Sequence, residues 1–295
     1  MKFPSAPLIL AATAPITGSL YAETVAQSAS RLVDPEPRSM QWRFDTRSSY
    51  VFESDFKDAR LGSQDALQYT ASLNAALPIA EKWNLVLGGG YDCFNFSGTG
   101  TLIPDTLQGA YATIGLEYLY EGNPAVILTL QPGNYSAGTF DSGNFSMPSL
   151  LAGGYRFTDR LVGVGGVLVS SFREYPVLPM LGFKWEVSDS VRIDAVLPDA
   201  GIVFKAAEGI DLALTASITG GAYKTSDNDP LSPNDRVDYT DYRAGLGVIV
   251  TRFKPFDIQL GGGWSIRREF TYDNLDRGYR AGSEPYAQVR IQATF

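Results

Sequence analysis

The chain ends in the stretch "AQVRIQATF", residues 287–295, in which apolar and polar side chains alternate without exception. Successive side chains of a β-strand point to opposite faces, so this period of two predicts a strand with one apolar and one polar face. Arg290 lies in the middle of the polar face. The strand therefore needs an apolar environment on one side and water or an opposite charge on the other.

The same alternation runs through most of the chain. Apolar residues alternate with polar or small ones over 67–77, 110–120, 210–219 and 241–250. Helical spacing of apolar residues is nowhere sustained over three turns. The 30 glycines and the aromatic fraction of 12% also suit strands and turns better than helices. The sequence therefore predicts an all-β fold.

The connections between these strands also alternate. Short turns are separated by connections that are mostly longer, polar or rich in glycine, which predicts about fourteen strands and places both chain ends on one side. A count of twelve stays open, because two of the connections are themselves short. The short turns are Glu81-Lys82, Glu121-Gly122-Asn123, Thr158-Asp159-Arg160, Ser188-Asp189, Ala207-Glu208-Gly209 and Phe253-Lys254-Pro255, and the other connections are 57–64, 97–105, 133–144, 173–176, 198–200, 223–237 and 272–284.

Two architectures accept such strands: a soluble secreted sandwich and a membrane barrel. The strands are roughly 11–15 residues long, which suits a tilted crossing of a bilayer. Aromatic residues gather at strand ends, as in the girdles of membrane barrels. Charges lie inside strands on the polar phase, where a lipid-facing arginine would cost about 2–4 kcal/mol but a lumenal one would not. We therefore expect residues 40–295 to form a single closed antiparallel transmembrane β-barrel.

The polar phase of such a barrel faces an enclosed lumen, and charged side chains on it are candidates for a lumenal site. Asp45 falls on this phase, between two of the candidate arginines. The candidate lumen-lining residues are Arg43, Arg47, Glu117, Lys184, Arg192, Asp194, Asp211, Asp241, Arg243, Asp257, Arg267 and Arg290.

The last strand resembles the C-terminal signal of bacterial outer-membrane proteins, in which alternate apolar residues lead to a terminal phenylalanine. Val289, Ile291 and Phe295 match that pattern, and the resemblance implies recognition by the barrel-assembly machinery. Residues 80–225 resemble an uncharacterised family of putative outer-membrane β-barrel proteins, which implies location and fold but no activity. This second resemblance is carried by Pro132-Gly133, Pro176, Pro179, Gly182 and Pro198.

The N-terminus predicts export. Lys2, a short apolar region over 7–16 and the small residue Ala22 are typical of a cleaved secretory signal over residues 1–22. A buried N-terminal helix is the alternative. Residues 23–39 are polar, lack periodicity and contain two prolines, which predicts a flexible periplasmic leader. With the barrel pattern, these features predict the bacterial outer membrane as the location.

Composition excludes several kinds of chemistry. The chain has no histidine and one cysteine, so it cannot form Ser–His or Asp–His pairs or a four-ligand zinc site of the usual residues. The glycine-rich strings lack nucleotide-binding spacing. The net charge of −8 comes without a basic stripe, which argues against nucleic acid as a partner. We expect neither an enzyme nor a cofactor.

The leading functional hypothesis is a passive pore or conduit for small solutes or hydrophobic compounds, with a mixed-charge lumen and the loops 223–237 and 272–284 at its outer mouth. The alternative is a plugged structural or adhesive barrel whose loops bind a partner or lipopolysaccharide. Bulky residues on the inner phase point to this alternative: Val51, Phe94, Tyr111 and Tyr239. Outer-membrane lipids and lipopolysaccharide are the other expected partners, and the oligomeric state stays open.

Overall fold

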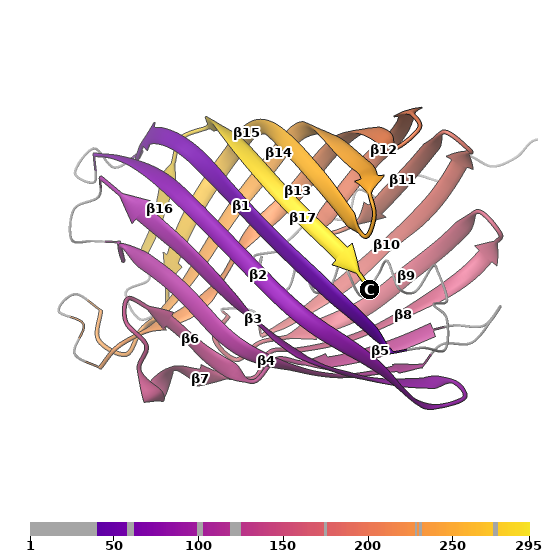
Figure 1. The fold of residues 1–295 in the computed structure, drawn as a ribbon. Helices are drawn as coiled ribbons and strands as arrows, with labels where there is room; N and C mark the ends of the chain where they lie inside the picture. Colours follow the sequence, from indigo (N-terminus) through magenta and orange to yellow (C-terminus); the bar gives the residue numbers. More distant parts are fainter. Residues whose placement is uncertain are drawn as a thin grey trace, which may run out of the picture.

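The computed structural model describes residues 40–57, 62–98, 103–118, 125–173, 176–227, 229, 232–273 and 277–295. These residues form one sheet of 17 strands, and 14 strands close into an antiparallel barrel (Figure 1). The expected signal peptide, 1–22, and leader, 23–39, lie outside the described residues. Within the described ranges, no helix is both long and apolar enough to span a membrane.

The barrel strands follow one another around the ring in chain order, and three short strands and a 3-10 turn add to its long-loop end. The barrel strands are β1 (Gln41–Asp55), β2 (Ser63–Ala80), β3 (Trp83–Ser97), β4 (Thr106–Tyr118), β5 (Ala125–Leu130), β8 (Ser149–Thr158), β9 (Leu161–Val169), β10 (Val177–Ser188), β11 (Val191–Val196), β12 (Asp199–Ala207), β13 (Ile210–Thr225), β14 (Arg236–Phe253), β15 (Phe256–Tyr272) and β17 (Glu284–Thr294). The additions are β6 (Gly133–Ala137), η2 (Ser142–Asn144), β7 (Phe145–Ser146) and β16 (Arg277–Ala281).

The first and last strands close the barrel. β1 pairs with β2 on one side and with β17 on the other, from Arg43 opposite Thr294 to Val51 opposite Tyr286. At the short-turn end, the Trp42 and Phe295 backbones exchange hydrogen bonds of 3.1 and 2.9 Å. The alternating strand that ends the sequence is therefore the strand that removes the last free edges of the sheet.

The outer surface of the barrel is apolar. Leucines on the outward phase are strongly exposed, with Leu181 at 83% and Leu246 at 67%. Aromatic pairs flank this band near the strand ends: Trp83 and Tyr118 have ring centroids 4.9 Å apart, and Phe256 and Phe295 6.0 Å apart. A soluble sandwich would bury these leucines between two sheets. Their exposure on a closed barrel is the arrangement of a transmembrane barrel.

The long-loop end is narrower than the short-turn end. There, β13 separates from the short strand β12 and pairs in parallel with β6, Lys224 opposite Ser136 and Thr225 opposite Ala137. The buried side chain of Asn144 stabilises the β6–β13 pairing. It donates hydrogen bonds to the Lys224 carbonyl at 2.8 Å and to Ser136 Oγ at 3.0 Å. Because β6 also pairs with β4, this route bypasses β5 and β8–β12, and fewer strands surround this part of the lumen. A smaller ring can be filled by side chains alone.

Buried side chains fill that narrow half. Phe94 and Phe96 of β3 meet Tyr239 of β14 and Phe270 of β15, with ring centroids 4.8–5.5 Å apart. Phe94 also contacts Tyr223 of β13 at 6.2 Å. These five rings come from opposite parts of the wall and each is at most 4% exposed. The hydrophobic core of this protein therefore lies inside the long-loop half of the barrel.

Apolar side chains face lipid and polar ones face the lumen, so the cost of an added charge in the free energy of unfolding should depend on the face that carries it. Leu246→Arg places a guanidinium on the lipid face of β14, and we expect it to lower the free energy of unfolding by about 2–4 kcal/mol. Ile249→Arg, on the inward phase of the same strand and opposite Asp211, is the matched control and should cost much less. Urea unfolding in lipid vesicles measures both. Equal losses in the two variants would contradict the assignment of the faces.

Candidate functional site: a charged vestibule in the lumen

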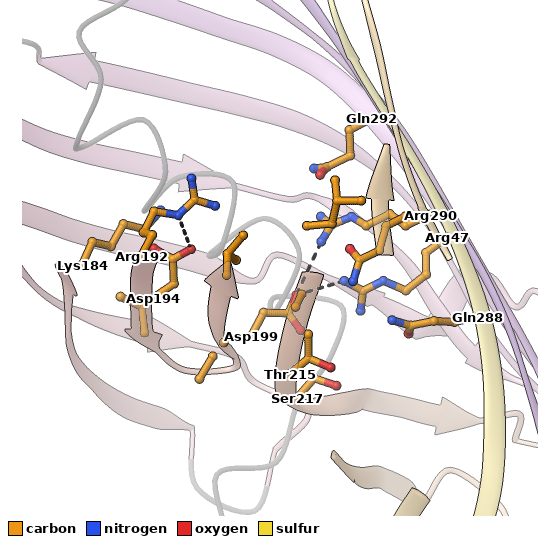
Figure 2. Close-up of a pocket in the computed structure, with 17 residues that line it drawn as sticks. Arg47, Lys184, Arg192, Asp194, Asp199, Thr215, Ser217, Gln288, Arg290 and Gln292 are labelled. Atoms are coloured by element: carbon orange, nitrogen blue, oxygen red, sulfur yellow. Dashed lines mark hydrogen bonds and ion pairs between the residues drawn. The ribbon is translucent and has the colours of Figure 1, made fainter. Parts of the chain in front are cut away.

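The half of the lumen near the short turns contains a cavity of about 240 Å³, which we call the vestibule. Figure 2 shows its two walls: side chains of β10–β13 face side chains of β1 and β17 across the space. The charged groups on its wall keep partial access to solvent, from 11% for the Arg290 side chain to 52% for that of Arg192. The polar and charged lining residues are Arg47, Lys184, Arg192, Asp194, Asp199, Thr215, Ser217, Gln259, Gln288, Arg290 and Gln292.

Closure of the barrel brings two positive charges together on the vestibule wall. The β1–β17 register sets Arg47 directly opposite Arg290, and both point inward. Like charges directly opposite each other on neighbouring strands are destabilising. Asp45 holds Arg290 with two oxygens, at 3.1 Å from Nε and 2.7 Å from Nη2. Asp199 reaches across the lumen to Arg47 Nη2 at 3.0 Å and Arg290 Nη1 at 3.9 Å (Figure 2).

The opposite wall carries a second charged group. On β11, Arg192 Nε donates to Asp194 Oδ2 at 3.0 Å. Lys184 of β10 is the ladder partner of Asp194, which brings two cations to one carboxylate. Nearer the short turns, Arg43 lies 3.6 Å from the buried carboxylate of Glu117.

A polar layer separates the vestibule from the aromatic core. Arg243 Nε donates to Asp241 at 2.8 Å, and its Nη1 donates to Ser49 at 2.9 Å. Ser265 donates to the other oxygen of Asp241 at 2.6 Å. The Arg243 guanidinium also lies over the Tyr286 ring, 4.9 Å from its centre. Both charged side chains are fully buried, and their contacts link the neighbouring strands β14, β15, β17 and β1 on the inner face of the wall.

Gln68 extends this layer to the far wall. Its amide donates to the Tyr239 hydroxyl at 3.0 Å and accepts from Ser49 and Thr219 at 3.3 and 3.4 Å. The inward residues of β1 show the order of the layers along the barrel axis: Arg47 lies in the vestibule, Ser49 in the polar layer and Val51 in the apolar core. The polar layer therefore closes the inner end of the vestibule in this structure. It is formed by side chains of the barrel strands.

The candidate lumen residues fall into three groups. Arg47, Lys184, Arg192, Asp194 and Arg290 line the vestibule. Arg43 and Glu117 pair beside it, and Asp241 and Arg243 form the polar layer. Asp211 and Asp257 lie on the inward phase near the short turns, two residues from the lining residues Ala213 and Gln259.

Arg267 differs from the expectation. A β-bulge shifts the register between β14 and β15, so that Tyr242 faces Arg267 while Arg243 faces Ser265. The extra residue reverses the alternation, as bulges do. Arg267 thus lies on the outward phase, where it pairs with Glu269 at 2.5 Å. Its neighbour Arg268 takes the inward place, fully buried, and donates to Ser54 Oγ and to the Gln64 carbonyl.

The sequence did not single out two residues of the site. Asp199 lies in a segment, 198–200, that was expected to be a connection, but it begins β12 and carries the cross-lumen ion pairs. The only feature of the sequence that could have marked Asp199 is a carboxylate at the beginning of a strand. Gln68 has no charge to mark it, and its role depends on strands that are far apart in the sequence.

Val289, Ile291 and Phe295 lie on the outward phase at the end of the chain, with Phe295 at 59% exposure. Their recognition by the assembly machinery stays a prediction. Among the residues that the structure describes, no group of three histidine, cysteine, aspartate or glutamate side chains is placed to hold a metal ion.

The bridging role of Asp199 can be tested by neutralising it. Asp199→Asn leaves Arg47 and Arg290 facing each other with one carboxylate between them, and we expect a loss of about 1–3 kcal/mol in the free energy of unfolding. Asp189→Asn is the matched control, because Asp189 pairs with Arg160 outside the barrel and is 93% exposed; it should change little. If both variants unfold alike in urea, Asp199 does not bridge the arginines.

Several solved structures are similar to this chain. The chain is similar to the COG4313 outer membrane channel from Pseudomonas putida F1, at 13% identity and a TM-score of 0.49, over 89% of this chain and 98% of that one. It is also similar to a deltaS2 mutant of the TodX monoaromatic hydrocarbon channel (11%, TM-score 0.49, 88% and 91%). The translocator domain of the autotransporter NalP from Neisseria meningitidis is similar too (12%, TM-score 0.38, 96% and 100%).

No curated protein matches the sequence significantly. The model of one family, described as "Domain of unknown function (DUF6268)", matches residues 39–279, which is most of the chain. The protein is therefore a closed β-barrel that belongs to the DUF6268 family.

Proposed function

We propose that this barrel is an outer-membrane conduit for small polar solutes that is closed at rest by its own wall. The observation that carries the proposal is the vestibule, a charged cavity with partial solvent access in the half of the barrel that faces the periplasm if the short turns lie there, as in other outer-membrane barrels. A barrel that served only as a scaffold could fill this half with packed side chains, as it fills the long-loop half, instead of keeping a charged cavity. The charged lining favours polar solutes over hydrophobic compounds.

The closed state follows from the layer above the vestibule. Asp241, Arg243 and Gln68 span the lumen, and the rings around Tyr239 fill the space behind them. Passage of a solute requires these side chains, or the β6–β13 pairing that narrows this half, to move. The rate of passage is thus set by a packed layer rather than by an open hole.

Conductance across a planar bilayer tests the conduit. We expect rare or small channel steps for the wild type, and larger, frequent ones for Tyr239→Ala/Phe270→Ala, which removes two rings from the core of the closed half. Tyr50→Ala/Phe52→Ala is the matched control, because it removes a ring pair, 5.2 Å between centroids, from the lipid face. Its conductance should equal that of the wild type.

The same measurement separates the second candidate function, a plugged structural or adhesive barrel. The packed aromatic core favours that function, since it needs no path through the lumen. Absence of channel steps in both the wild type and the double ring variant, with both proteins folded as shown by the shift of unboiled samples on gels, would refute the conduit and leave the structural role.

A further inference from the structure

The composition of the vestibule wall indicates which solutes it accepts. Arg47 and Arg290 on one side and Lys184 and Arg192 on the other bring four cationic side chains to the cavity, against the carboxylates of Asp194 and Asp199. Each carboxylate is shared between two of these cations: Asp199 contacts both Arg47 and Arg290, and Asp194 contacts Arg192 and has Lys184 as its ladder partner. Asp45 binds Arg290 from beside the cavity, so four cations meet three carboxylates. The wall keeps an excess of one positive charge, although the whole protein is acidic at −8.

The two charged groups face each other. Figure 2 shows Lys184 and Arg192 on one wall and Arg47 and Arg290 on the opposite wall, with the cavity between them. A solute in the cavity would meet cations on both sides. Charge-assisted hydrogen bonds from guanidinium and ammonium groups to an anion are stronger than neutral ones, and arginine can bind a carboxylate or phosphate with two parallel bonds.

The remaining polar lining suits hydroxyl groups. Gln259, Gln288, Thr215 and Ser217 lie between the charged groups, and amide and hydroxyl side chains both donate and accept hydrogen bonds. The volume of about 240 Å³ is below the roughly 300–1,000 Å³ of pockets that hold drug-sized ligands, which limits the occupant to a small molecule. The aromatic rings, which would stack on an apolar ligand, lie behind the polar layer and outside the cavity.

We propose that the vestibule is a binding site for a small hydroxylated anion, such as a monosaccharide that carries a carboxylate. The proposal rests on the proposed function in taking the vestibule as the entrance of the conduit. Binding itself needs no passage through the closed half, so it can be measured on the resting protein.

Calorimetric titration of the folded full chain in detergent tests the site with three probes of one ring size: glucuronate, glucose and glucosamine. We expect saturable binding of glucuronate that weakens as salt is added, since screening reduces the attraction. Glucose and glucosamine should bind at least about tenfold more weakly, because they lack the anionic group. Equal binding of the three sugars, or no binding of glucuronate, would overturn the proposal.

Variants locate the site. Lys184→Gln/Arg192→Gln should weaken glucuronate binding at least about tenfold, since the anion loses two charge-assisted bonds. Arg160→Gln/Arg252→Gln removes two arginines at the short turns outside the cavity, and it should bind as the wild type does. Equal weakening in both double variants would place the anion elsewhere and overturn the proposal. Glucuronate binding by a protein that never conducts would refute the conduit alone.

Discussion

The backbone ladder between the first and last strands is the contact on which the whole structure depends. In a bilayer, an unpaired N–H or C=O costs several kcal/mol, so a sheet can span the membrane only without an edge. β17 removes the edge by pairing with β1 from Tyr286 to Thr294. In the closed barrel, successive side chains of each strand point alternately to lipid and to the lumen. The same ladder makes Arg47 and Arg290 face each other, and the carboxylates of Asp45 and Asp199 offset the two charges.

The two halves of the lumen differ in width and in the side chains that fill them. In the short-turn half the full ring of strands leaves room for a charged cavity with partial access to solvent. In the long-loop half the β6–β13 pairing reduces the ring, and the aromatic rings of Phe94, Phe96, Tyr239 and Phe270 fill it. A membrane barrel has no hydrophobic core between sheets, so this filling supplies packing that a wide lumen would lack. The packing that stabilises this half therefore also closes the lumen there.

The sequence predicted the faces of the strands but not their long-range contacts. Strict alternation over 287–295 is a local property, and the inward placement of Arg290 follows from it. The bulge at Arg267 is invisible to alternation, since one added residue reverses the phase without changing the composition. The parallel β6–β13 contact leaves no local pattern either. Part of the expected connection at 223–237 is strand, because β13 continues to Thr225 and β14 begins at Arg236. Asp199 was missed because its partners come from the opposite wall.

Closure is tested most directly by disulfide cross-linking between the chain ends in a Cys93→Ser background. The pairs are Ser48→Cys/Val289→Cys and Ser49→Cys/Gln288→Cys, because neighbouring pairs of an antiparallel ladder alternate in geometry. Ser48→Cys/Tyr69→Cys, between β1 and β2, is the control. In membranes under oxidising conditions, we predict that at least one end-to-end pair cross-links as efficiently as the control and shifts the boiled, unreduced protein on gels. Cross-linking of the control alone would contradict a closed barrel.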